Sequence, residues 1–172
     1  MDWNDHCPFS LLTDFQSSLT RLIYRVLAPV NANMSELIIY NQTFASDLHV
    51  SADVQKEIQE LWQARGMSDM DLPDLQLALE EGLANAIKHG NKMDPEKKVT
   101  VECFLNEDIV RVVIQDEGPG FNVNEVPDPT LPENLDKPSG RGVMLMKAFM
   151  DDVLYNEVGN QLTFIKRCTF NS

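Results

Sequence analysis

The sequence predicts a single α/β domain in which amphipathic helices and β-strands form a two-layer core. The 172 residues of the chain suit one compact domain that can bury such a core. Hydrophobic residues make up 43% of the chain and charged residues 24%, which is the usual globular mixture. Helical and alternating apolar patterns follow one another from residue 35 onward. We therefore divide the chain into an N-terminal extension at 1–34 and one domain at 35–172.

The N-terminal extension contains one predicted amphipathic helix at 14–27, where apolar residues recur at helical spacing before Pro29. This helix either packs on the domain or contacts a second copy or another partner, and the sequence favours neither. No apolar run approaches the roughly twenty residues needed to cross a bilayer, and the acidic N-terminus lacks the basic segment of a signal peptide. We therefore expect a cytoplasmic protein without membrane contact.

The first half of the domain is predicted to form a strand at 35–44 and helices at 50–65 and 72–89. Ser51 is the expected N-cap of the first helix, and Gly66 is its expected end. Gly90 is expected to end the second helix. The apolar stripe of the second helix, which should face the core, consists of Leu72, Leu75, Leu79, Leu83 and Ala86.

The second half is predicted to form strands at 97–106 and 109–116, a helix at 143–150, and strands at 153–157 and 162–167. Each pair of strands makes a hairpin. In the strand at 109–116, alternation places Asp116 on the same face as Val112 and Ile114, which is the face that the helices would cover. The segment at 121–139 contains four prolines and is too interrupted for regular structure, so we interpret it as a lid.

Charge and cysteine content exclude several kinds of site. The formal net charge of −13 argues against direct nucleic-acid binding. A protein this acidic can hold a polyanion only where Mg²⁺, backbone amides or helix N-termini make the local potential positive. Cys7, Cys103 and Cys168 are widely scattered without CxxC spacing, which indicates neither a disulfide framework nor a zinc site. Cys103 is expected to be a small core residue.

The helix at 72–89 carries a first candidate motif. Glu81 and Asn85 are four residues apart and so share one helix face, which Lys88 and His89 should continue. Phosphoryl transfer needs an oxygen ligand for Mg²⁺ and a carboxylate that can accept a hydroxyl proton, which Asn85 and Glu81 could supply. Lys88 could balance phosphate charge. On their own, residues of these types are more typical of a solvated helix face.

A second candidate motif follows the strand at 109–116. Asp116 begins a D-x-G-x-G sequence that includes Gly118 and Gly120. Its carboxylate could accept the exocyclic amine of adenine, and the glycines would let backbone approach the base. Turns are rich in Asp and Gly, so this motif is also weak when taken alone.

A third candidate motif, Gly140 to Gly142, leads directly into the helix at 143–150. The free amides and positive dipole end of that helix could receive a phosphate, and Arg141 and Lys137 could add positive charge. The chain contains neither a G-x-x-x-x-G-K-[ST] nor a G-x-G-x-x-G sequence, so P-loop and Rossmann sites are excluded.

Taken in order, E-x-x-x-N-A at 81–86, D-x-G-x-G at 116–120 and G-x-G at 140–142 resemble the N, G1 and G2 boxes of the GHKL ATPases. That superfamily includes gyrase, heat-shock chaperones, histidine kinases and MutL. The resemblance covers residues 35–168. Within the superfamily, the compact size and the run from 137 to 152 look most like the bacterial anti-sigma-factor serine/threonine kinases.

This resemblance implies a Bergerat-type ATP-binding fold, with helices over one face of a mixed, mostly antiparallel sheet and Mg-ATP held between helices and lid. By position, Glu81 would be the catalytic base, Asn85 the Mg²⁺ ligand and Asp116 the adenine contact. The other implied nucleotide-binding residues are Lys88, Gly118, Gly120, Gly140, Arg141, Gly142 and Thr163. Of these, Thr163 would support Asp116 through a water.

The same resemblance implies an ATP-dependent serine/threonine protein kinase of the partner-switching type. Such a protein phosphorylates a serine on an antagonist (anti-anti-sigma) protein and sequesters a sigma factor, and so regulates transcription. Homodimers are common in that family, and a homodimer is one assembly we consider. Two alternatives stay open: a non-catalytic ATP-dependent binding module, and a stand-alone catalytic domain that serves a separate histidine phosphoacceptor.

Overall fold

The structure is a computed structural model that describes residues 36–121 and 141–171. The extension at 1–34 with its predicted helix, the lid beyond Phe121, Lys137 and Gly140 lie outside the described residues. The elements in chain order are β1 (Leu37–Ala45), α2 (Leu48–Ala64), α3 (Leu72–Asn85), the π-helical turn η1 (Ala86–Gly90), β2 (Lys98–Asn106), β3 (Ile109–Asp116), α4 (Arg141–Phe149), β4 (Asp152–Tyr155) and β5 (Gln161–Arg167).

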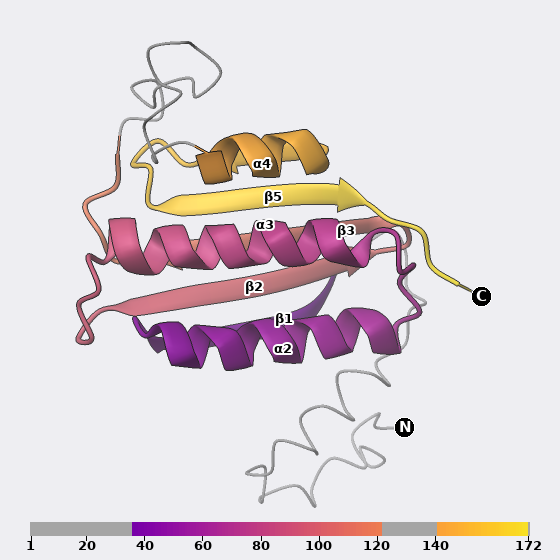
Figure 1. Cartoon of the computed structure of the whole chain (residues 1–172), viewed down its shortest axis with the longest axis horizontal. Coiled ribbons are helices and arrows are strands. Elements are labelled where there is room, and N and C mark those ends of the chain that lie inside the picture. The colour runs from indigo at the N-terminus through magenta and orange to yellow at the C-terminus, as the bar shows by residue number, and fades with distance from the viewer. Residues whose placement is uncertain (1–35, 122–140, 172) are drawn as a thin grey trace, which may run out of the picture.

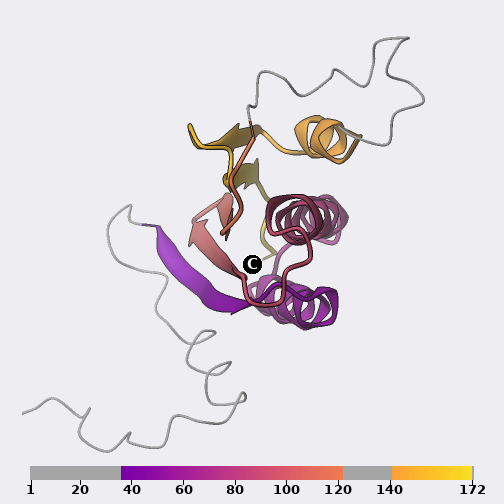
Figure 2. The ribbon, with the colours of Figure 1, turned by 90° about the vertical axis from the view of Figure 1, so that its left-hand side faces the viewer.

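The described strands form one five-stranded sheet in the order β1-β2-β3-β5-β4. Helices α2, α3 and α4 all lie over the same face of this sheet (Figures 1 and 2). The predicted two-layer α/β architecture is therefore confirmed. Every pairing between the described strands is antiparallel. The expected sheet was mixed and mostly antiparallel, whereas the described sheet is antiparallel throughout. None of the described helices is long and apolar enough to cross a membrane.

Helix α2 begins earlier than the sequence pattern predicted. Its N-cap is Asp47, whose side chain accepts hydrogen bonds from the backbone N–H groups of His49 and Val50. The prediction of Ser51 as the cap is wrong: Ser51 is buried within the helix, and its hydroxyl lies 3.1 Å from the Gln55 amide nitrogen. Asp47, four residues upstream of Ser51, satisfies the free amides first, so the helix gains its extra residues at the N-terminus.

The predicted helix at 72–89 changes character near its end. It is α-helical to Asn85 and then widens into η1, where the N–H of Asn91 donates to the carbonyl of Ala86 at 2.8 Å. A hydrogen bond spanning five residues is π-helical, and such turns occur often at functional sites. The α-helical spacing that placed Lys88 and His89 on the face of Glu81 therefore does not hold beyond Asn85.

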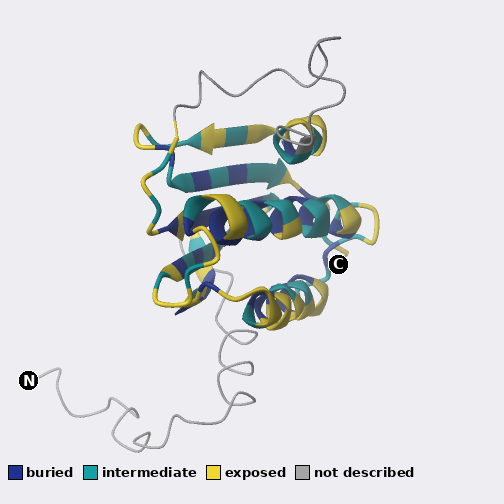
Figure 3. Cartoon of the chain, turned by 60° about the vertical axis from the view of Figure 1, so that its left-hand side comes forward, coloured by how far each residue is buried: buried dark blue, intermediate teal, exposed yellow. Residues whose placement is uncertain are grey.

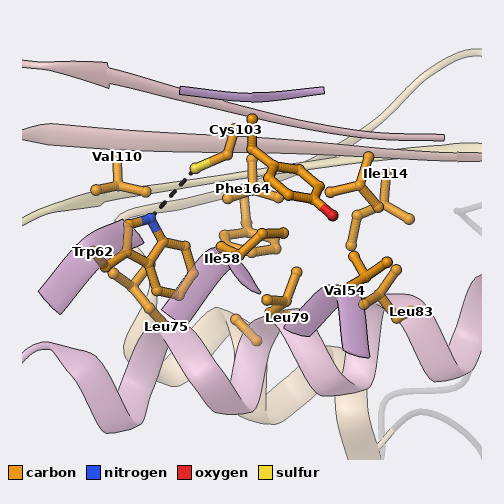
Figure 4. Packing of buried hydrophobic residues seen from close by; sticks show 14 of the residues in the cluster. Val54, Ile58, Trp62, Leu75, Leu79, Leu83, Cys103, Val110, Ile114 and Phe164 are labelled. Atoms are coloured by element: carbon orange, nitrogen blue, oxygen red, sulfur yellow. Dashed lines mark hydrogen bonds between the residues drawn. The ribbon is translucent and has the colours of Figure 1, made fainter. Parts of the chain in front are cut away.

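The hydrophobic core lies between the sheet and the helices, where Trp62 and Cys103 are both fully buried (Figure 4). The indole N–H of Trp62 donates to the Cys103 sulfur at 3.3 Å, which links α2 to β2. Burial raises the pKa of the Cys103 thiol to about 12. Its expected role as a core residue is confirmed. Figure 3 shows buried residues alternating with less buried ones along the strands, as in β5.

Strand register brings Asp116 to the edge of this core. Asp116 pairs with Val99, and the next row on the same face of the sheet contains Val101, Ile114 and Leu162. Gly82 of α3 lies directly over that row, because a Cβ on Gly82 would be 2.7 Å from the Ile114 Cδ1 and 2.9 Å from the Leu162 Cδ2. The absence of a side chain at Gly82 lets α3 approach the sheet closely, just before the ends of β3 and α3 meet.

Candidate active site

Asp116 lies where β3 ends, on the face of the sheet that the helices cover, as the alternation predicted. It is buried, with 9% of its surface exposed, and its Oδ1 accepts the backbone N–H of Gly118 at 2.7 Å. Burial raises the pKa of the Asp116 carboxyl above its ordinary value of 3.8, against the opposing effects of the Gly118 N–H and the Lys97 charge. A buried carboxyl with a shifted pKa is typical of a functional site.

Two glycines pack directly against this carboxyl. A Cβ on Gly90, the last residue of η1, would lie only 2.3 Å from the Asp116 Cγ. A Cβ on Gly118 would lie 2.2 Å from the carbonyl oxygen of Gly90. Neither position has room for a side chain, so the backbone of the turn lies against the end of the helix. The sequence pattern indicated Gly90 only as a helix end and carried no signal for this contact.

The turn after β3 also packs against the turn between β4 and β5. Gly120 has a φ of +74°, and a Cβ there would lie 1.9 Å from the carbonyl oxygen of Val158. The rings of Phe121 and Tyr155 meet edge to face, with centroids 5.0 Å apart. Burial, with a smaller contribution from the Asp116 charge, raises the pKa of Tyr155 to about 12. No motif in the sequence indicated this aromatic pair.

The other end of the site lies between α3 and the start of α4. Glu81 is partly buried, and its Oε2 lies 2.1 Å from the position that a Cβ on Gly142 would occupy. The carboxylate of Glu81 is thus at the first turn of α4, which begins at Arg141. The amides of a first helical turn lack partners within the helix and attract anions. The structure therefore brings together two residues that were predicted from separate motifs.

Asn85 and Lys88 continue the segment that joins these two ends. Asn85 is partly buried and is the last residue of α3, whereas Lys88 lies on η1 with its side chain exposed. From Glu81 to Gly90 the chain advances about 13 Å, at a rise of about 1.5 Å per residue. One segment therefore contacts Gly142 near its first residue and Asp116 at its last.

Thr163 is not brought together with Asp116. It pairs with Val113 of β3 and with Leu154 of β4, so alternation places it on the face of the sheet opposite to Asp116. The residue opposite Asp116 is Asn160, whose carbonyl accepts the N–H of Asp116 at 3.0 Å. The register of the final hairpin, which depends on the length of its turn, decides this. The Arg141 side chain lies outside the described structure.

The residue types present fit a magnesium nucleotide. Asn85 and Glu81 offer the oxygen ligands that Mg²⁺ prefers. In the described part of the chain, no group of three or more His, Cys, Asp or Glu side chains could hold a metal ion. A magnesium ion here would therefore need phosphate oxygens and water molecules as its remaining ligands. Gly90 and Gly118 bring the backbone of the helix end and of the turn directly against the Asp116 carboxylate, so a base bound to this carboxylate would meet backbone and not side chains at these two positions.

Comparison with known proteins identifies the family of this chain. The family model described as a histidine kinase-like ATPase domain matches residues 44–166. The serine-protein kinase RsbW of Staphylococcus epidermidis is 29% identical over 121 residues, which are 66% of this chain and 76% of that protein. The anti-sigma F factor of Clostridium perfringens is 32% identical over 59% of this chain and 75% of that protein.

A further relative and a solved structure extend the comparison. The anti-sigma F factor of Oceanobacillus iheyensis is 34% identical over 48% of this chain, and the match spans 58% of that protein. A crystal structure of the RsbU and RsbW domains of a Mycobacterium tuberculosis protein has the same fold, with a TM-score of 0.55 and 18% identity. The structural match covers 77% of this chain and 33% of the Mycobacterium tuberculosis chain. This chain belongs to the histidine kinase-like ATPase family of the GHKL superfamily, in which it is similar to the anti-sigma-factor serine kinases.

Proposed function

We propose that this protein binds Mg-ATP between α3 and the start of α4 and transfers the γ-phosphate to a serine of an antagonist protein. One observation carries the proposal: the segment from Glu81 to Gly90 contacts Gly142 near one end and Asp116 at the other. Its length of about 13 Å accommodates a base at one end and phosphates at the other.

At the base end, Asp116 accepts the exocyclic amine of adenine. Its carboxylate is held by the Gly118 N–H at 2.7 Å and has Gly90 directly against it, so its position is fixed before the nucleotide arrives. A carboxylate can accept more than one hydrogen bond, so the site favours a purine that supplies a donor there. The absence of side chains at Gly90 and Gly118 lets the backbone pack against this carboxylate and hold it in place.

At the phosphate end, Glu81 removes the proton from the attacking serine hydroxyl. As the serine oxygen bonds to the γ-phosphorus, the bond from that phosphorus to the β–γ bridging oxygen breaks and ADP leaves. The proton stays on the Glu81 carboxylate until it passes to solvent. The Asn85 side-chain oxygen would hold a magnesium ion, which would supply positive charge to neutralise and orient the phosphates. The first-turn amides of α4 beside Gly142 receive phosphate oxygens.

The names of the relatives support the choice of partners. Two of the relatives are anti-sigma F factors and one is a serine-protein kinase. We therefore propose that this protein also sequesters a sigma factor and that phosphorylation of the antagonist controls the exchange between the two partners. In this way it regulates transcription without touching nucleic acid, as its net charge of −13 predicts.

The test uses γ-labelled ATP and candidate antagonist proteins from the same genome, with Glu81→Gln compared to Glu80→Gln. The neighbouring Glu80 is exposed and makes a matched control. We expect Glu81→Gln to lower the rate of transfer on the order of 10²- to 10⁴-fold, the usual contribution of a general base, with little change in Mg-ATP affinity. Glu80→Gln should transfer at the parental rate.

Transfer by Glu81→Gln at the parental rate would show that Glu81 is not the base. ATP binding without labelling of any antagonist by the parent would instead indicate the non-catalytic module. An acid-labile product would indicate a histidine acceptor and not a serine.

A further inference from the structure

The peptide group that joins Asp116 to Glu117 is held on both sides by asparagine side chains. Its N–H, which belongs to Glu117, donates to the Oδ1 of Asn91 at 2.9 Å. Its carbonyl, which belongs to Asp116, lies 3.4 Å from the Nδ2 of Asn160. Asn91 follows η1, and Asn160 lies in the turn between β4 and β5. Two loops far apart in the sequence therefore hold the single peptide group that carries the candidate base-binding residue.

Asn91 uses both ends of its side-chain amide. Its Nδ2 donates to the carbonyl of Lys98 at 2.9 Å, while its Oδ1 accepts from Glu117. Its backbone N–H also closes the π-helical turn on Ala86. The residue is fully buried, with 0% of its surface exposed. Only a side chain with a donor and an acceptor in this geometry links the start of β2 to the end of β3, and an aspartate offers no donor.

Asn160 is itself held in place by Asn156. The Oδ1 of Asn156 accepts the backbone N–H groups of Gly159, Asn160 and Gln161, at 2.7, 3.0 and 3.2 Å. Its Nδ2 donates to the Oδ1 of Asn160 at 2.8 Å. The backbone of Asn160 completes the contact, because its carbonyl accepts the N–H of Asp116 at 3.0 Å. The turn is thus a preformed support for the last residue of β3.

The direction of the Asp116 carboxylate depends on this support. Its Oδ1 is bonded to Gly118, two residues along the same turn, and Gly90 lies directly against it. Rotation of the peptide between Asp116 and Glu117 would therefore move the carboxylate relative to a bound base. Hydrogen bonds weaken steeply with distance and angle, so small rotations would matter for recognition of an exocyclic amine.

We infer that Asn91 and Asn160 are positioning residues that set the selectivity of this site for a 6-aminopurine. They hold the Asp116–Glu117 peptide between two loops, and that peptide aims the Asp116 carboxylate at the amine. The inference rests on the proposed function, in which Asp116 contacts adenine. Neither residue belongs to the three motifs that the sequence displays.

The test compares the dissociation constants of Mg-ATP and Mg-purine riboside triphosphate, which lacks only the 6-amino group. The proteins are the parent, Asn91→Ala, Asn160→Ala and, as a control, Asn41→Ala, whose side chain bonds Glu102 on the exposed face of the sheet. We expect the parent and the control to prefer ATP by roughly 10- to 150-fold, the range for a hydrogen bond to a charged group. Asn91→Ala and Asn160→Ala should reduce that preference to about threefold or less, by weakening ATP alone.

A merely structural role would weaken both nucleotides equally, so an unchanged preference in the two variants would overturn the inference. Should Asn91→Ala fail to fold, Asn160→Ala decides, because it lies in a surface turn and leaves no fully buried cavity. A parent protein without any preference would overturn the proposed adenine contact itself and the inference with it. A parent with the preference whose Asn160→Ala variant retains it would overturn the inference alone.

Discussion

Replacement of Gly90 by alanine tests the closest contact in the candidate site. The added Cβ would lie 2.3 Å from the Asp116 Cγ and 2.4 and 2.5 Å from its two oxygens. Unstrained contacts between such atoms need about 3.5 Å, so the carboxylate would have to withdraw by about 1 Å. The φ of Gly90 is not positive, so alanine causes no backbone strain there and the effect is steric.

The expected magnitude follows from the hydrogen bond that this displacement removes. A shift of about 1 Å takes the carboxylate out of hydrogen-bond range of the adenine amine. A hydrogen bond to a charged group contributes about 1.5–3 kcal/mol. At about 1.4 kcal/mol for each tenfold change, the dissociation constant for Mg-ATP should rise roughly 10- to 150-fold. Crowding should also lower the free energy of unfolding by about 1–3 kcal/mol.

Calorimetric titration with Mg-ATP measures the affinity, and thermal denaturation measures the stability. Gly66→Ala is the matched control, because Gly66 has a φ of +79° and a Cβ there would lie 2.9 Å from the carbonyl of Asn171. This control should lose stability and keep its affinity, since it lies at the end of α2, away from Asp116. If Gly90→Ala bound Mg-ATP with the parental affinity, the proposal that adenine binds at Asp116 would be refuted.

Four further predictions concern the charge of Asp116, the magnesium ligand and the start of α2. The pKa of Asp116 is raised above 3.8, and only its carboxylate form accepts the adenine amine, so the affinity for Mg-ATP should fall as the pH falls through this pKa. Calorimetric titrations of Asp116→Asn should lack this pH dependence. In the protein without nucleotide, the free energy of unfolding should fall as the pH rises from 3.8 through the raised pKa of Asp116. The reason is that the folded state binds the Asp116 proton more tightly than the unfolded chain does. Asn85→Ala should bind ATP equally with and without Mg²⁺ in calorimetry, and a retained magnesium dependence would exclude Asn85 as the ligand. Asp47→Ala should lower the free energy of unfolding by about 0.5–2 kcal/mol, and a larger loss in Ser51→Ala would contradict the observed cap of α2.

Much of the fold was predictable because local patterns determine its elements. The alternation in the strand at 109–116 reproduces the bounds of β3, Ile109–Asp116, and the face on which Asp116 lies. The apolar stripe predicted for the helix at 72–89 is buried. Both patterns reflect which side chains avoid water, and this is encoded residue by residue.

The errors arose where nonlocal contacts or competing caps decide the outcome. Asp47 and Ser51 are both good caps, and only the start of the helix shows which one is used. The π-helical turn depends on hydrogen bonds made by Asn91 to residues beyond the helix, so periodicity within the helix could not reveal it. Thr163 was assigned to Asp116 by position, whereas the register of the final hairpin places Asn160 there.

The candidate site was predictable as a set of residues and less so as a geometry. Glu81, Asn85 and Asp116 were identified from spacing and resemblance. The contacts of Gly90 with Asp116 and of Glu81 with Gly142 join segments that are distant in the sequence. Contacts of this kind follow from packing of the helices on the sheet, and a one-dimensional pattern does not contain them.

The central claim is that the end of β3 and the segment from Glu81 to Gly90 enclose one site for a magnesium nucleotide. Calorimetric titration of the full chain with ATP, in the presence and absence of Mg²⁺, tests it most directly. We expect saturable binding of one ATP per site in the presence of Mg²⁺, weaker binding without it, and a large loss of affinity in Asp116→Ala. The absence of any binding heat with Mg-ATP at several temperatures, or parental affinity in Asp116→Ala, would contradict the claim.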